Sequence, residues 1–440
     1  MTDLDLMLKL LLQLGIILVT CRAVGWFGQR FLGQTQVVME MLAGVLLGPS
    51  LLGILAPQVQ KDLFPKEFAT PVIYHGAKLG HPSMSIIYCL SQIGLVFYMF
   101  LVGLEFDVDL LRKSAKSALA VSLAGIAAPF ILGALLGLML AGNTTFFAAK
   151  VAPLNGALYL GAALCITAFP MLARILFEQG IAQTSMGTLA LASGASNDVV
   201  AWIMLAVVIA VNKGDVNYAA YAIGGGTLFA LFLFTIAKRA LALLGRATEK
   251  AGKLTPTIFL TMMVCVIFSA YITDAIGVYA VFGAFMAGAA MPKGQFAVLV
   301  RKQLELPVTV FFLPLFFVYS GLNTRIDMVD TPYLWGITGL VCAAAIVGKG
   351  LACALAAKAS GQPWRESWAI GSLMNSRGLM ELILVNIAKK AGVITDQLFT
   401  ILVIMAVVTT LMASPLYRWI YGNVRASAEP VNLEAVAIPI

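Results

Sequence analysis

The chain alternates between long apolar stretches and short polar connections from near its first residue almost to its last. Each stretch can cross a hydrocarbon layer as a helix, which needs roughly 20 apolar residues. The pattern predicts thirteen such helices, at residues 6–28, 35–55, 86–106, 117–141, 155–177, 184–211, 218–244, 255–274, 278–292, 304–322, 332–357, 367–388 and 396–421. The ninth is short, and the fifth and twelfth are interrupted. We therefore expect an all-α membrane protein of about 13 transmembrane helices.

Composition and charge place these helices in a lipid bilayer. Of the 440 residues, 60% are hydrophobic and only 11% are charged, too few to solvate an ordinary globular surface. With the N-terminus outside, Lys and Arg are about twice as frequent in the inner connections as in the outer ones. This predicts a cytoplasmic C-terminus, in what we expect to be a bacterial inner membrane. Basic inner loops facing anionic headgroups account for the net charge of +8, so no nucleic acid is expected as a partner.

Features outside the predicted helices add little chemistry. All six cysteines fall inside predicted spans without metal-ligand spacing, so they are interpreted as packing residues, and no cofactor is expected. The N-terminal apolar run lacks the marks of a signal peptide and is kept as the first helix. His75 and His81 lie in the external connection at residues 56–85, where we expect ordinary exposed histidines, with a pH-sensing role as the alternative. The short polar end at residues 423–440 predicts a cytoplasmic tail without a nucleotide-binding regulatory domain.

Two of the predicted helices contain residues that interrupt a helix. In the fifth, Pro170 lies at mid-membrane depth and removes a backbone donor. In the twelfth, Asn375-Ser376-Arg377-Gly378 lies at similar depth. Irregular backbone persists there only when it is buried in protein or faces a water-filled cavity. Helices four to six and eleven to thirteen each have an interrupted middle helix, and the odd offset between them orients the two triplets oppositely. We expect an inverted repeat with two broken, crossing helices.

Asp198 is the strongest candidate for a functional residue. A carboxylate near the middle of a membrane helix costs several kcal/mol, so such a residue is a functional-site candidate by default. Asp198 borders a stripe of small residues on which another helix can pack: Gly187, Ala190, Gly194, Asn197 and Ala201. Desolvation disfavours the charged carboxylate, so it can hold a proton or a dehydrated cation, but not both. Such competition is an exchange mechanism. A carboxylate that only holds helices together is the alternative.

Neighbouring oxygen atoms could complete a site for an alkali cation. Thr167, the carbonyl groups freed near Pro170 and the amide of Asn197 would supply further hard ligands. An aspartate at position 197 could carry a second proton, whereas an amide cannot. We therefore predict one cation per proton and electroneutral exchange.

Lys349 and Arg377 are the two cations that we assign to the membrane interior and not to the connections between spans. Arg377 could neutralise the carbonyl end of a half-helix or pair with Glu381 four residues later, and direct participation in ion release is the alternative. Glu381 is equally a candidate for a salt bridge and for an ion ligand. Lys349 could pair with the site or neutralise a helix end, and the sequence assigns it no firm role. Three further acidic residues lie near span ends, where we expect them to reach the aqueous interface: Glu40, Glu105 and Asp274.

At these positions the chain resembles the monovalent cation:proton antiporter-2 family, and most closely the transmembrane part of plant-type cation/H⁺ exchangers. The resembling motifs are residues 46–50, 167–176, 195–198 with Ala201-Trp202, 281–285, 313–317 and 375–382. The resemblance implies a sodium/proton antiporter fold and exchange of Na⁺ or K⁺ for H⁺ in pH homeostasis. It also implies that Asp198, Asn197 and Thr167 form the ion site and that Lys349 and Arg377 are buried cations.

The same resemblance implies a homodimer in which a core domain moves against a dimerisation domain by an elevator mechanism. The implied boundaries are 1–112 (dimerisation helices 1–3), 113–214 (core helices 4–6), 215–250 (linker helix 7), 251–328 (dimerisation helices 8–10), 329–422 (core helices 11–13) and 423–440 (tail). Two departures matter. The long C-terminal regulatory domains common in the family are not expected here, and Tyr279 stands where relatives often have histidine.

Three other functions are open at this point. A sodium-coupled symporter for an organic anion would need an anion site at the crossed half-helices, which Asp198 disfavours. A potassium-efflux channel should offer rings of carbonyl or acidic groups, and the sequence contains no repeated acidic groups of this kind. A membrane sensor that transports nothing is the third.

Overall fold

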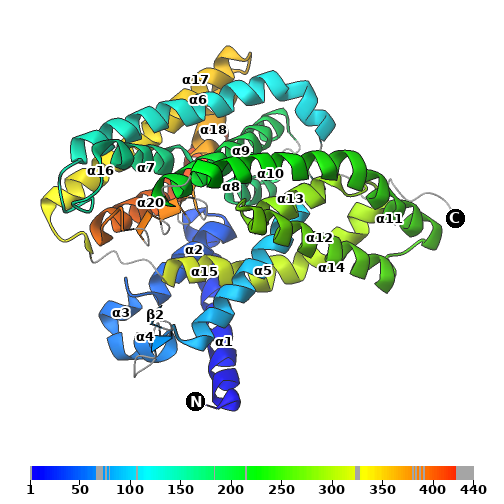
Figure 1. Ribbon diagram of the computed structural model, residues 1–440, viewed down its shortest axis with the longest axis horizontal. Helices are drawn as coiled ribbons and strands as arrows, with labels where there is room; N and C mark the ends of the chain where they lie inside the picture. The colour runs from blue at the N-terminus through cyan, green and yellow to red at the C-terminus, as the bar shows by residue number, and fades with distance from the viewer. Residues whose placement is uncertain are drawn as a thin grey trace.

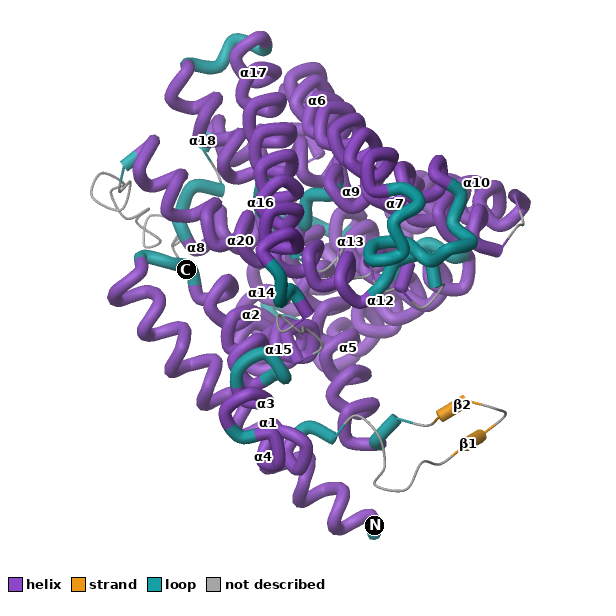
Figure 2. The backbone as a smooth tube through the Cα atoms, turned by 90° about the vertical axis from the view of Figure 1, so that its left-hand side faces the viewer, coloured by secondary structure: helices purple, strands orange, loops and turns teal. Residues whose placement is uncertain are grey.

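The computed structural model describes residues 2–65, 73–74, 77–78, 80–105, 108–182, 184–213, 216–322, 328–378, 381, 384–385, 388–389 and 392–422. This part of the chain is helical apart from one small hairpin, β1 (Ile73–Tyr74) paired with β2 (Ala77–Lys78) (Figure 2). Nine of its helices are long and apolar enough to cross a membrane, and two shorter apolar helices accompany them, Pro153–Cys165 and Ala280–Ala290. The all-α membrane class is confirmed, while the number of thirteen crossings stays a prediction.

One group of helices packs through glycine, and we call it the glycine-packed bundle. Its elements are α1 (Asp3–Phe27), α2 (Gln36–Leu47), α3 (Leu52–Leu55), α4 (Pro57–Leu63), α5 (Pro82–Glu105), α12 (Pro256–Ile276), α13 (Ala280–Ala290), α14 (Gln295–Pro307) and α15 (Leu313–Leu322). A Cβ atom on Gly321 of α15 would lie 2.4 Å from the carbonyl carbon of Gly44 in α2. One on Gly103 of α5 would lie 2.1 Å from the carbonyl oxygen of Phe285 in α13. These helices therefore touch backbone to backbone, as small residues allow in membranes.

A second group contains the interrupted helices, and we call it the broken-helix bundle. Its elements are α6 (Val108–Leu140), α7 (Pro153–Cys165), α8 (Phe169–Glu178), α9 (Ser185–Lys213), α16 (Pro332–Ile346), α17 (Ala352–Ala359), α18 (Trp364–Met374) and α20 (Asp396–Tyr421), with a π-helical turn, η5, at Val347–Leu351. Its helices α6, α16, α17 and α18 fill the upper part of both views, above α2, α5 and α15 (Figures 1 and 2). Helix α10 (Val216–Phe232) packs on both α9 and α12, and α11 (Lys238–Ala251) continues from it.

The structure corrects two expectations about polar residues. Glu40 does not reach an interface, because its side chain is 3% exposed and accepts a hydrogen bond of 3.2 Å from the amide of Gln36, which also contacts α1 through Cys21 O. His81 is 6% exposed, with its ring Nδ1 2.8 Å from Ser83 Oγ, so it is not an exposed loop histidine. His75 and the tail at residues 423–440 lie outside the described residues.

Candidate ion-binding site

The two interrupted helices meet at their breaks. Helix α7 ends at Cys165, residues 166–168 are extended, and α8 begins at Phe169 with Pro170 in its first turn, where a missing N–H is tolerated. Helix α18 ends at Met374 and is followed by the non-helical residues 376–378. The Ala168 N–H donates to the Ser376 carbonyl at 3.1 Å. The Thr167 hydroxyl donates to the Met374 carbonyl at 3.2 Å. Each break therefore satisfies backbone groups that the other one frees.

The predicted ion-site residues come together at this meeting point. From α9, the Asn197 Oδ1 accepts the Thr167 N–H at 3.1 Å, and the Asp198 Oδ1 accepts the Phe169 N–H at 3.4 Å. Thr167, Asn197 and Asp198 are 0%, 1% and 5% exposed. The positive N-terminal end of α8 thus faces the carboxylate, an arrangement that favours an anion. Gly194, one turn before Asp198, allows α9 to lie close to α8, because a Cβ atom there would lie 2.7 Å from a methyl carbon of Leu172 in α8.

Asp198 lies at the boundary between the two bundles. It borders a cavity of about 10 Å³ whose other walls are Met99, Phe169, Ala195, Val281, Phe282 and Phe285. Met99 belongs to α5 and residues 281–285 to α13, both in the glycine-packed bundle. The rings of Phe169 and Phe285 meet edge to face across this boundary, 5.4 Å apart at 83°. A space of this size holds about one water molecule, and Asp198 is only 5% exposed.

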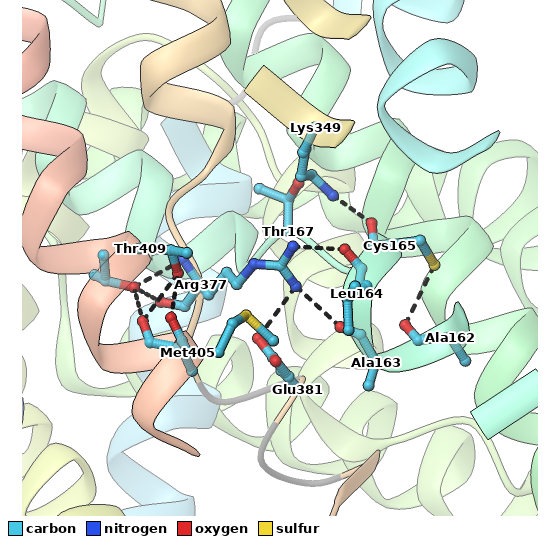
Figure 3. Close-up of polar contacts among 12 residues, drawn as sticks. Ala162, Ala163, Leu164, Cys165, Thr167, Lys349, Arg377, Glu381, Met405 and Thr409 are labelled. Carbon is cyan, nitrogen blue, oxygen red and sulfur yellow. Dashed lines mark hydrogen bonds and ion pairs between the residues drawn. The ribbon is translucent and has the colours of Figure 1, made fainter. Parts of the chain in front are cut away.

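Both buried cations bind the carbonyl end of α7. Figure 3 shows their side chains converging on residues 163–165. The Arg377 guanidinium donates to Ala163 O at 2.9 Å and to Leu164 O at 2.5 Å, and the Lys349 ammonium donates to Cys165 O. Lys349 comes from the π-helical turn η5, a kind of turn often found at functional sites. These contacts offset the partial negative charge at the C-terminus of a half-helix.

Arg377 has further partners that fix its place. Its guanidinium forms an ion pair of 3.4 Å with Glu381, and both side chains are fully buried. Its backbone N–H donates to the Thr410 hydroxyl of α20 at 3.0 Å. The sequence interpretation missed Thr410, since threonine is common within membrane helices and nothing in its neighbourhood distinguishes it. Arg377 therefore contacts both the carbonyl end of α7 and the Glu381 carboxylate, the two structural partners considered from the sequence.

Comparison with known proteins places the chain in a family. The model of the family described as "Sodium/hydrogen exchanger, transmembrane" matches residues 15–420. The Na(+)/H(+) antiporter NhaS4 of Synechocystis sp. is 38% identical over 426 residues, which are 95% of this chain and 98% of that protein. The chain belongs to the sodium/hydrogen exchanger family. It is therefore an integral membrane transporter and not an enzyme.

Two more relatives of this exchanger chain show how far the likeness extends. Cation/H(+) antiporter 17 of Arabidopsis thaliana is 36% identical over 94% of this chain, but the chain spans only 48% of that protein's length. The solved structure of the sodium proton antiporter MjNhaP1 from Methanocaldococcus jannaschii matches with a TM-score of 0.63 at 16% identity, covering 96% of this chain and 99% of that one. The antiporter fold is thereby shown.

Proposed function

We propose that this chain exchanges a monovalent cation, Na⁺ or K⁺, for H⁺ by alternating access, with the two ions competing for Asp198. One observation carries the proposal. Among the described residues, Asp198 has no ion-pair partner, whereas both buried cations nearby are bound to carbonyl groups of α7. A deprotonated Asp198 is therefore a buried charge supported by one backbone N–H and a helix end. Such a charge is stable only with a proton or a cation bound to it.

Thr167, Asn197 and the buried ends of the broken helices are the remaining parts of the proposed cation site. The Asn197 Oδ1 already accepts one hydrogen bond from Thr167, which leaves a second lone pair for a cation. Pro170 and Gly378 would keep the two breaks open. We assign Lys349, Arg377 and Glu381 to the electrostatic balance of the site and not to proton carriage. A small cavity beside a carboxylate suits an inorganic cation better than an organic anion.

A stoichiometry of one cation per proton follows from the residues that can titrate. Asn197 carries no proton, and Lys349 is bound to the end of α7. A single carboxylate that alternates between a proton and a cation moves no net charge. We therefore propose electroneutral exchange.

We propose further that the broken-helix bundle is the moving core and that the glycine-packed bundle is the static unit through which two copies form a homodimer. The proposed core comprises helices four to six and eleven to thirteen, related as an inverted repeat. The position of Asp198 at the boundary supports this division, because a shift of one bundle along the other would expose the site to alternate sides. The N-terminus would lie outside and the C-terminus in the cytoplasm of a bacterial inner membrane.

Flux in proteoliposomes tests these proposals. Purified protein with a pH dye inside the vesicles should move protons in response to Na⁺, K⁺ or Li⁺ gradients, at a rate independent of a voltage set by ionophore. Asp198→Asn should reduce flux to background, while Asp62→Asn, at an exposed carboxylate of α4, should keep the wild-type rate. If a folded Asp198→Asn variant still exchanges ions, Asp198 is not the ion-binding residue. A voltage-dependent driving force would contradict the one-to-one ratio.

A further inference from the structure

A deep groove opens on the face of the broken-helix bundle, away from Asp198. It has a volume of about 530 Å³ and lies between η5, α18 and α20. Its floor includes Gly350 and Gly371, which face each other so closely that a Cβ atom on Gly371 would lie 2.3 Å from Gly350 O. Trp368 and Trp419 form part of the walls and are 42% and 84% exposed. The groove exists because glycines line the crossing point while large side chains stand around it.

The distance from Arg365 to the inner end of the groove matches one leaflet of a membrane. The groove follows α18 from Trp368 to Asn375. Arg365 lies in the first turn of α18, before the groove, and Asn375 is ten residues beyond it. At 1.5 Å per residue this distance is about 15 Å, half of the roughly 30 Å hydrocarbon thickness. Apart from the indole groups, Ser372 and Asn375 are the lining residues with polar side chains. The groove therefore has the dimensions and the apolar lining for a lipid acyl chain.

Positive charge lies beside the outer end of the groove. The Arg365 guanidinium donates to Ile420 O at 3.0 Å and to Tyr421 O at 3.1 Å, which holds it beside the groove residue Ile420. The Lys358 ammonium lies 5.5 Å from the ring centroid of Trp364, across the turn between α17 and α18. Arg365 and Lys358 flank the groove and are not among its lining residues, and neither is Glu366, the acidic residue of this turn. Arginine, lysine and tryptophan are the residues that gather at lipid headgroups.

We propose that this groove binds one acyl chain of an anionic phospholipid, with the phosphate against Arg365 and Lys358. The chain end then reaches Gly371 and Asn375, directly before the break that contains Arg377. The bound lipid therefore braces η5, which carries the buried Lys349, and α18, which ends three residues before the buried Arg377. The proposal requires the membrane location of the chain and is independent of which ion it carries.

Native mass spectrometry of the full chain tests the proposal. The protein is released from detergent after titration with phosphatidylglycerol or with phosphatidylcholine of the same chains. Wild type should retain one phosphatidylglycerol under conditions that strip phosphatidylcholine. Val347→Trp, which fills the groove from its exposed wall, should lower that retention at least tenfold, whereas Val264→Trp on the exposed face of α12 should not change it.

The headgroup contact has its own control. Arg365→Gln should make the retention of the two lipids equal, and Arg246→Gln, at an exposed position of α11, should leave the preference intact. Equal retention of both lipids by wild type would overturn the proposal without any variant. Unchanged retention of phosphatidylglycerol by Val347→Trp would also overturn it. The same holds if Arg365→Gln still retains phosphatidylglycerol in preference to phosphatidylcholine.

Discussion

The two bundles differ in how they satisfy buried helix backbone, although both contain close glycine contacts, such as Gly371 against Gly350 in the broken-helix bundle. In the glycine-packed bundle continuous helices satisfy their own backbone groups, and Gly44, Gly103 and Gly321 bring neighbouring backbones into contact. In the broken-helix bundle the interruptions free carbonyl and N–H groups at depth, and Arg377, Lys349 and Asp198 bind them. The difference teaches that the buried charges and the proposed ion site have one origin, the pair of breaks.

Removal of Arg377 should have the largest effect on stability. Arg377→Ala leaves Glu381 buried without its ion pair and two carbonyls of α7 without a donor, so we expect a loss of about 3–5 kcal/mol. The matched change in the other bundle is Arg301→Ala. It removes the half-exposed ion pairs of Arg301 with Glu105 and Glu305, and we expect it to lower the free energy of unfolding by less than about 1 kcal/mol. Unfolding of both variants in detergent compares them, and equal losses would contradict the contrast between the bundles.

A methyl group at a glycine contact should have an intermediate effect. Gly321→Ala forces its Cβ atom against the backbone of α2, and we expect a loss of about 1–3 kcal/mol from overpacking. Gly339→Ala in α16 is the control, because nothing lies within 4 Å of its Cβ position, so this change should be neutral or stabilise by up to about 1 kcal/mol. If both variants melt at the wild-type temperature, the glycine-packed description is wrong.

The smallest effect is expected where the bundles touch. Glu178 of α8 accepts the Gln36 N–H at the start of α2 at 2.8 Å and pairs with Arg174 at 2.6 Å. Glu178→Gln should lower stability by less than about 1 kcal/mol, since the pair is partly exposed. If the broken-helix bundle moves, the same change should alter the exchange rate more than the melting temperature. Glu249→Gln on exposed α11 should alter neither quantity.

The sequence predicts the breaks and the carboxylate because both follow from local chemistry. A proline at mid-membrane, a polar run at residues 375–378 and an aspartate in an apolar helix are each costly whatever surrounds them. The partners of Lys349 and the burial of Glu40 were not predictable in this way. Both depend on how neighbouring helices are rotated. The π-helical turn η5 directs Lys349 towards the end of α7, and the contact of Gln36 with α1 accompanies the burial of Glu40.

The dependence of cation affinity on pH tests the central claim, competition for Asp198, most directly. The KM for the transported cation would be measured in proteoliposomes over a range of pH, equal on both sides. If one proton excludes one cation, KM should rise by about tenfold per pH unit at the acidic limit while the maximal rate at saturating cation stays constant. A KM that does not change with pH, with only the maximal rate falling in acid, would contradict competition at one carboxylate.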